Sequence, residues 1–173
     1  MIILGIDPGT ASTGYGIVQK IENQKTKRPI FKCLNYGVIK TSPDSNPGER
    51  LKRINNELSK IIKKYRPDSM AVENIYFFKN WKTVIPVSQA EGVILLTAAK
   101  NKVSVHKFTP LQAKLAVTGN GRAEKKDVQE KLKEILKLKE IPKPDDAADA
   151  LAIAITCIIK ISPRGLTDIF GKL

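Results

Sequence analysis

The first strand and the turn that follows it are set by residues 2–10, Ile-Ile-Leu-Gly-Ile-Asp-Pro-Gly-Thr. Residues 2–6 form an unbroken apolar run, which is typical of a buried strand. Asp7 follows at the edge of that run, where an ionised carboxyl group is costly unless something neutralises it. The stretch therefore predicts a buried strand that ends in an acidic group.

Two further strands are predicted immediately downstream. Residues 14–21 and 30–40 are strand-like, and the polar link 22–29 between them is short enough for a hairpin. Consecutive strands with so short a connection pair antiparallel. The first part of the chain therefore predicts three antiparallel strands.

The next element is a helix with clear start and stop signals. Asn46 suits the cap position, Pro47 the first helical position, and Glu49 the acid of a capping box. Apolar residues then recur at helical spacing as far as Tyr65, and Arg66-Pro67 ends the pattern. The basic residues of this helix are expected to form its solvated back, and no site role is assigned to them.

The remainder of the chain alternates strands and helices. The expected strands are residues 69–73 and 103–108, and the expected helices are residues 87–101, 110–117, 124–138 and 145–161. This order predicts an α/β fold, with a mixed five-stranded sheet of three antiparallel strands followed by parallel strands, and helices on both faces. We expect one domain over residues 1–163 and a loosely ordered tail over 164–173.

Three other acidic residues resemble Asp7 in their setting. Glu73 ends the apolar run 70–72, and Asp146 and Asp149 precede the apolar stretch 150–159. Several carboxylates that converge from distant segments need cations, and oxygen ligands suit Mg²⁺ or Mn²⁺. Spacing alone does not choose between Asp145 and Asp146, because both share a helical face with Asp149. These aspartates could also simply stabilise the positive end of the helix dipole.

The net charge of the chain indicates what kind of molecule it binds. Thirty Lys and Arg against seventeen Asp and Glu give a net charge of +13, which favours a polyanionic substrate such as nucleic acid. A merely basic protein or a ribosomal component would show the same excess.

Cys33 and Cys157 lie in apolar surroundings and are expected to be reduced thiols in a cytoplasmic protein. No signal peptide is indicated, and the run 150–159 is too short to span a bilayer, so no membrane partner is expected.

The combined motifs resemble the RuvC family of Holliday junction resolvases. The resemblance rests on Gly5-Ile-Asp7-Pro-Gly-Thr10, Val72-Glu73 and Asp146-Ala-Ala-Asp149-Ala-Leu-Ala, with Gln89-Ala90, Gly92 and Gly121-Arg-Ala-Glu-Lys125 between them. It covers almost the whole chain. It implies an RNase H-like fold, a homodimer, and a Mg²⁺-dependent endonuclease that resolves four-way DNA junctions by paired symmetric nicks in recombination and repair.

The resemblance also implies the site residues. The catalytic, metal-binding acids fall on Asp7, Glu73, Asp146 and Asp149, in favour of Asp146 over Asp145, and two Mg²⁺ ions (or Mn²⁺) per site are expected. The functionally important lysines fall on Lys114 and Lys125. An aromatic residue that contacts the junction centre falls on Tyr76, with Phe77 next. Among the neighbouring basic residues we expect Lys79 and Arg122 to contact DNA, whereas Phe78 and Trp81 are expected in the core or the dimer interface.

Two residues depart from the family pattern. Pro86 lies inside the middle helix and would delay its start or kink it, and Glu91 stands where a basic residue is expected. Both leave the dimer geometry open if that helix forms the dimer interface. His106 is expected to be structural.

Two other functions would also use features of this sequence. A non-catalytic scaffold could bind branched DNA through the basic surface alone. An actin-like or sugar-kinase-like ATPase would share the motif Gly-Ile-Asp-Pro-Gly-Thr, but such proteins need two domains of this kind, and 173 residues are too few. A branch-migration complex that delivers the junction is a possible further partner of the nuclease.

Overall fold

Five strands form one mixed sheet in the order β3-β2-β1-β4-β5. The structure is a computed structural model that describes residues 1–23, 29–74 and 81–161. The strands are β1 (Ile2–Asp7), β2 (Ser12–Glu22), β3 (Pro29–Lys40), β4 (Ser69–Glu73) and β5 (Ser104–Phe108). β1 pairs antiparallel with β2 and parallel with β4, β2 pairs antiparallel with β3, and β4 pairs parallel with β5. The predicted strand directions are confirmed.

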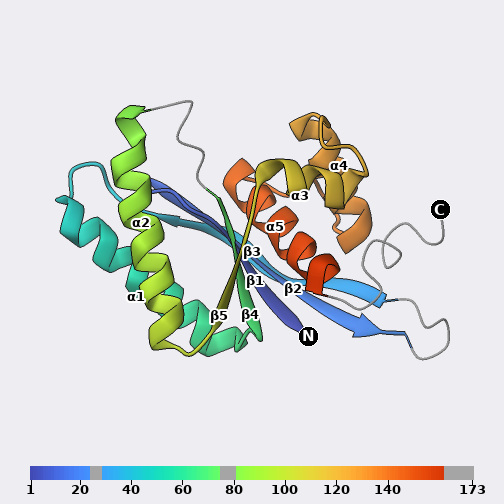
Figure 1. Cartoon of the computed structure of the whole chain (residues 1–173), viewed down its shortest axis with the longest axis horizontal. Coiled ribbons are helices and arrows are strands. Elements are labelled where there is room, and N and C mark those ends of the chain that lie inside the picture. The colour runs from blue at the N-terminus through green and yellow to red at the C-terminus, as the bar shows by residue number, and fades with distance from the viewer. Residues whose placement is uncertain (24–28, 75–80, 162–173) are drawn as a thin grey trace.

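Five helices cover the two faces of this sheet, as Figure 1 shows. They are α1 (Pro47–Tyr65), α2 (Trp81–Lys100), α3 (Pro110–Thr118), α4 (Lys125–Leu136) and α5 (Asp145–Ile161). α1 and α2 lie on one face and α3, α4 and α5 on the other. Each face has its own apolar core, one containing Leu4 and Ile6, the other containing Ile3 and Ala71. The predicted helices on both faces are confirmed.

Strand alternation decides which face receives the acidic residues. Ile3 of β1 and Ala71 of β4 pack into the core beneath α5. Side chains two residues apart along a strand share a face. Asp7 is four residues after Ile3, and Glu73 is two after Ala71, so both belong to the α5 face. Ile6 is paired with Val72 across the parallel strands, which places Asp7 and Glu73 at neighbouring strand ends.

α5 lies unusually close to the sheet because two strand residues lack side chains. A Cβ atom built at Gly5 would overlap the backbone oxygen of Ala150, and one at Gly14 would overlap that of Asp146. Glycine is the residue that permits so close an approach of helix backbone to strand backbone. The helix therefore rests directly on β1 and β2. Its N-terminal end lies at the acidic edge, which is the edge of the sheet where β1 ends in Asp7 and β4 ends in Glu73.

The local start signals act as the sequence predicts. The Asn46 side chain accepts a hydrogen bond from the Glu49 amide at 2.9 Å, and Thr109 with Gln112 forms a capping box at the start of α3. Of the two effects predicted for Pro86, a delayed start or a kink, the delayed start is wrong, since α2 begins at Trp81 and contains Pro86. At that position proline removes the hydrogen bond to the Lys82 carbonyl, and the remaining turns continue without it. α4 is shorter than the predicted 124–138.

Some predictions concern residues outside the described ranges. Tyr76, Phe77, Phe78 and Lys79 lie there, as does the tail 164–173. Trp81 begins α2, but its side chain is not among those described. In the part of the chain that is described, no helix combines the length and apolarity needed to cross a membrane.

Candidate active site

Asp7 and Glu73 form the floor of the candidate site. Burial raises the pKa of Asp7 to about 8, and the negative charges of Glu73, Asp149 and Asp146 push it in the same direction. Burial also raises the pKa of Glu73 to about 7, to which the charge of Asp149 adds while Lys125 opposes it. Both carboxyl groups therefore lie where a negative charge is unfavourable without a cation.

α5 contributes the other two acids. Asp146 lies over Gly14, and Gly14 is the residue paired with Asp7 in the antiparallel ladder. Asp149 lies one helical turn further on and is half-buried. Burial raises the pKa of Asp149 despite the opposing charge and hydrogen bond of Lys125. The two acids of the helix thus lie near the two acids at the strand ends.

The Asp145 side chain has different neighbours from that of Asp146. Its carboxylate is exposed, accepts a hydrogen bond from Gln129 Nε2 at 2.9 Å, and lies 3.2 Å from Lys125 Nζ. The hydrogen bonds from Gln129 and Lys125 lower the pKa of Asp145. Asp145 therefore faces α4, whereas the charge of Asp146 acts on Asp7. The two adjacent aspartates therefore have different surroundings, although spacing along the helix does not distinguish them.

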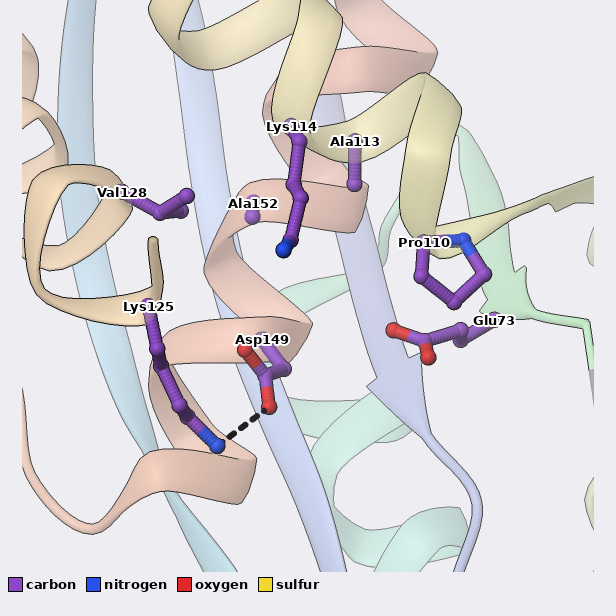
Figure 2. Close-up of a pocket in the computed structure, with 8 residues that line it drawn as sticks. All are labelled: Glu73, Pro110, Ala113, Lys114, Lys125, Val128, Asp149 and Ala152. Carbon is purple, nitrogen blue, oxygen red and sulfur yellow. Dashed lines mark ion pairs between the residues drawn. The ribbon is translucent and has the colours of Figure 1, made fainter. Parts of the chain in front are cut away.

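A pocket of about 180 Å³ lies between the acids and the helices α3 and α4. Its lining includes Glu73, Asp149, Lys114 and Lys125. Figure 2 shows Lys114 extending from α3 toward the space between Asp149 and Glu73. Lys125 Nζ lies 3.1 Å from Asp149 Oδ2. The two predicted lysines are therefore at the acidic pocket, where their ammonium groups can meet a phosphate.

The donor chemistry of this cluster fits a hard divalent cation. Four carboxylates from three elements supply only oxygen ligands. The raised pKa values of Asp7, Glu73 and Asp149 show that burial and the neighbouring negative charges disfavour the charged forms of these three groups. Within residues 1–23, 29–74 and 81–161, however, no three His, Cys, Asp or Glu side chains are arranged to share one metal ion. Here the cation beside Asp149 is Lys125.

A hydrogen-bonded network fixes the turn after Asp7. Thr41 Oγ1 donates to the Thr10 carbonyl at 2.6 Å and accepts from Arg50 Nε at 2.8 Å. The Thr41 amide donates to the Ala11 carbonyl, and Thr13 Oγ1 donates to the Gly9 carbonyl at 2.6 Å. The turn is thus tied to α1 through Arg50, a link that has no signal in the sequence.

The remaining predicted residues lie apart from this pocket or outside the described ranges. Arg122 is exposed in the loop between α3 and α4, where its amide donates to Asn120 Oδ1. His106 lies in β5, paired with Ala71. Glu91 is bound to Lys107 of β5 at 2.7 Å and is only 15% exposed. Neither this ion pair nor the contact between Gln129 and Asp145 was predicted, because both join segments without a shared motif.

Comparisons with known proteins give one consistent result. The sequence profile of the crossover junction endodeoxyribonuclease RuvC matches residues 3–157. The RuvC of Fusobacterium nucleatum is 51% identical over 172 residues, which are 99% of this chain and 86% of that protein. The Thermus thermophilus RuvC structure superposes with a TM-score of 0.82 at 36% identity, covering 90% of this chain and 92% of that one. A structure of T. thermophilus RuvC in complex with Holliday junction substrate gives a TM-score of 0.80 at 33% identity, with the same coverage.

Proposed function

The chain belongs to the RuvC family of crossover junction endodeoxyribonucleases, and from this membership and the geometry of the acidic edge we infer which residues carry the reaction. It is a Holliday junction resolvase with an RNase H-like fold. We assign catalysis to Asp7, Glu73, Asp146 and Asp149. The observation that supports this assignment is the electrostatic setting of Asp7, whose pKa is raised to about 8 by burial and by the charges of Glu73, Asp149 and Asp146.

The chain's own residues prepare the site in three ways. The half-buried floor of Asp7 and Glu73 offers anionic oxygens to a cation. Asp146 and Asp149 offer further oxygens from above, held there by the close contact between α5 and Gly14. Lys114 and Lys125 can hold the phosphodiester and offset the negative charge that develops on its oxygens. Divalent cations, when bound by these carboxylates, supply Lewis acidity and a more acidic water for phosphodiester hydrolysis, which leaves 3′-hydroxyl and 5′-phosphate ends.

The proposal extends to cofactors and partners. Two Mg²⁺ ions per active site, replaceable by Mn²⁺, suit four carboxylates that lack a preformed cage. A homodimer would place one site at each of two opposed strands, which matches paired symmetric nicks. The working protein is a cytoplasmic one-domain nuclease over residues 1–163, to which a branch-migration complex would deliver the junction. Tyr76, Phe77, Lys79 and Arg122 complete the proposed DNA contacts.

Incubation with synthetic DNA tests the assignment. The protein should cut a four-way junction in Mg²⁺ and leave Y-shaped and linear duplex DNA largely intact. Asp7→Asn should bind the four-way junction at least as tightly as the wild type and fail to cut it. Glu57→Gln is a matched control, because Glu57 is a surface acid paired with Lys60 on α1. Undiminished cutting by Asp7→Asn would remove Asp7 from the site.

The same experiment separates the competing functions. A non-catalytic scaffold would bind the junction and cut nothing at any Mg²⁺ or Mn²⁺ concentration. An ATPase would hydrolyse ATP without DNA. Membership of the nuclease family favours neither alternative.

A further inference from the structure

Lys125 is held by two acids, of which one stands outside the proposed catalytic set. Its ammonium nitrogen lies 3.1 Å from Asp149 Oδ2 and 3.2 Å from Asp145 Oδ2. The lysine side chain is 50% exposed, and a single exposed ion pair holds a long flexible side chain only weakly. Two carboxylates on the same side of α5 hold it in one place more firmly than either could alone.

Asp145 is itself fixed. Its second oxygen, Oδ1, accepts a hydrogen bond from Gln129 Nε2 at 2.9 Å. Lys125 and Gln129 lie four residues apart on α4, and Asp145 and Asp149 lie four residues apart on α5, so each pair shares one helical face. The two faces meet beside Val128, which is buried in the core shared with α5. The packing of α4 against α5 therefore determines where Asp145 holds the lysine.

The two acids have different environments. Asp149 is half-buried at the acidic pocket, where it lines the wall with Glu73. Asp145 is exposed and lies outside that lining. Any cation that engages Asp149 competes with Lys125 for its oxygens. Asp145 stays available to the ammonium group when that happens.

We propose that Asp145, braced by Gln129, is a positioning residue that keeps the Lys125 ammonium at the rim of the acidic pocket when Asp149 is engaged by another cation. The inference rests on the proposed function, since it presumes that Asp149 binds metal and that Lys125 meets the scissile phosphate. Asp145 itself touches neither the DNA nor the reacting atoms. Its role is to prevent a flexible lysine from leaving the site at the moment its charge is needed.

Single-turnover cleavage of a four-way junction by the full chain tests this role. Asp145→Asn removes the charge with almost no change of shape. We expect its rate constant to fall about 10-fold, the low end of the cost of removing a group that orients a site residue. Junction affinity should change less than about twofold, and Asp145→Glu should restore most of the rate. Glu134→Gln, which removes an exposed acid paired with Lys131, is the matched control.

A double-mutant cycle shows whether Asp145 acts through Lys125. In a Lys125→Met background, with excess enzyme and long incubation, Asp145→Asn should change the residual rate less than about twofold. An equal loss in both backgrounds would overturn the proposal, because it would mean that Asp145 acts independently, for example by stabilising the start of α5. The melting temperatures of the wild type, the two single variants and the double variant show whether a slower rate is caused by a loss of stability.

The position of the lysine can also be followed without cleavage. The side-chain ammonium signal of Lys125 in nuclear magnetic resonance spectra is identified by its loss in Lys125→Met. In the wild type we expect this signal to persist when Mg²⁺ is added, and in Asp145→Asn to broaden or vanish. An unchanged signal and an unchanged rate in Asp145→Asn would refute the proposal. A wild-type protein that cuts no junction would instead refute the proposed function, so the two failures are distinguishable.

Discussion

Gly14 of β2 lies directly beneath Asp146 of α5, with no room for a side chain between them. A methyl group at Gly14 would overlap the backbone carbonyl of Asp146. Because Gly14 is also paired with Asp7, this contact connects the start of α5 to the end of β1. The distance between the acids at the strand ends and the acids of α5 is therefore controlled by Gly14, a residue without a side chain.

Gly14→Ala should damage both stability and cleavage. The new methyl group has to push α5 away from the sheet, and overpacking of this kind costs about 1–3 kcal/mol of unfolding free energy. Chemical denaturation and single-turnover cleavage measure the two effects. Gly48→Ala is the control, since a Cβ atom there meets only the Asn46 side chain at 3.4 Å. A Gly14→Ala protein as stable and active as the wild type would show that α5 is not held by this contact.

The stability of the metal-free protein should fall as pH rises. The pKa of Asp7 is raised from 3.8 to about 8 and that of Glu73 from 4.5 to about 7, so the folded protein binds more protons than the unfolded chain between these values. The stabilisation is complete below about pH 4 and lost by about pH 8, with a slope of at most about 1.4 kcal/mol per pH unit for each proton. Melting temperatures between pH 5 and 9 in the presence of a chelator measure it.

Divalent cations and Asp7→Asn should each weaken this pH dependence. Mg²⁺ or Mn²⁺ should raise the melting temperature more at pH 8 than at pH 5, because protons compete with the metal for the same oxygens. Asp7→Asn should melt higher than the wild type at pH 8 without metal, since it removes a buried charge. If the melting temperatures of the wild type and Asp7→Asn changed with pH in parallel, the raised pKa of Asp7 would be contradicted.

Thr41→Val should loosen the turn that follows Asp7. The substitution keeps the shape of the side chain but removes the hydroxyl that joins the Thr10 carbonyl to Arg50. We expect a loss of about 1–3 kcal/mol in unfolding free energy, because two polar groups lose their partner, and a slower cleavage rate. Thr156→Val is the control, because the Thr156 hydroxyl donates to the Ala152 carbonyl within α5. Equal behaviour of both variants would show that the network does not orient Asp7.

Lys125→Met should impair cleavage far more than binding. Removing one group that stabilises transition-state charge costs about 100-fold or more in rate. The slope of binding affinity against salt should change by about one unit or less, because one phosphate contact is lost. Lys63→Met on the exposed back of α1 should change neither quantity. A large loss of affinity with an unchanged single-turnover rate would make Lys125 a binding residue.

Much of the fold could be predicted because its signals are local. The Asn46 and Thr109 caps, the apolar strands and the short link between β2 and β3 each lie within a few neighbouring residues. The start of α2 was predicted wrongly, because the cost of Pro86 is a local signal that the rest of the helix outweighs. The contacts of Glu91 with Lys107 and of Asp145 with Gln129 could not be predicted, since they join residues that are distant along the chain.

Local sequence patterns alone predict that acidic residues end two buried strands and begin one buried helix, and the composition shows that the surrounding protein is strongly basic. That Asp7 and Glu73 share a face follows from the pairing of β1 with β4 and from the packing of Ile3 and Ala71 against α5. The folded arrangement was needed to show that the charge of Asp146 acts on Asp7 and that the Asp145 side chain faces α4. The reason is that Asp145, four residues before Asp149, and Asp146, three residues before it, both share a helical face with Asp149, so the choice depends on how α5 is rotated. That rotation is set by its close packing on Gly5 and Gly14 and by its contact with α4.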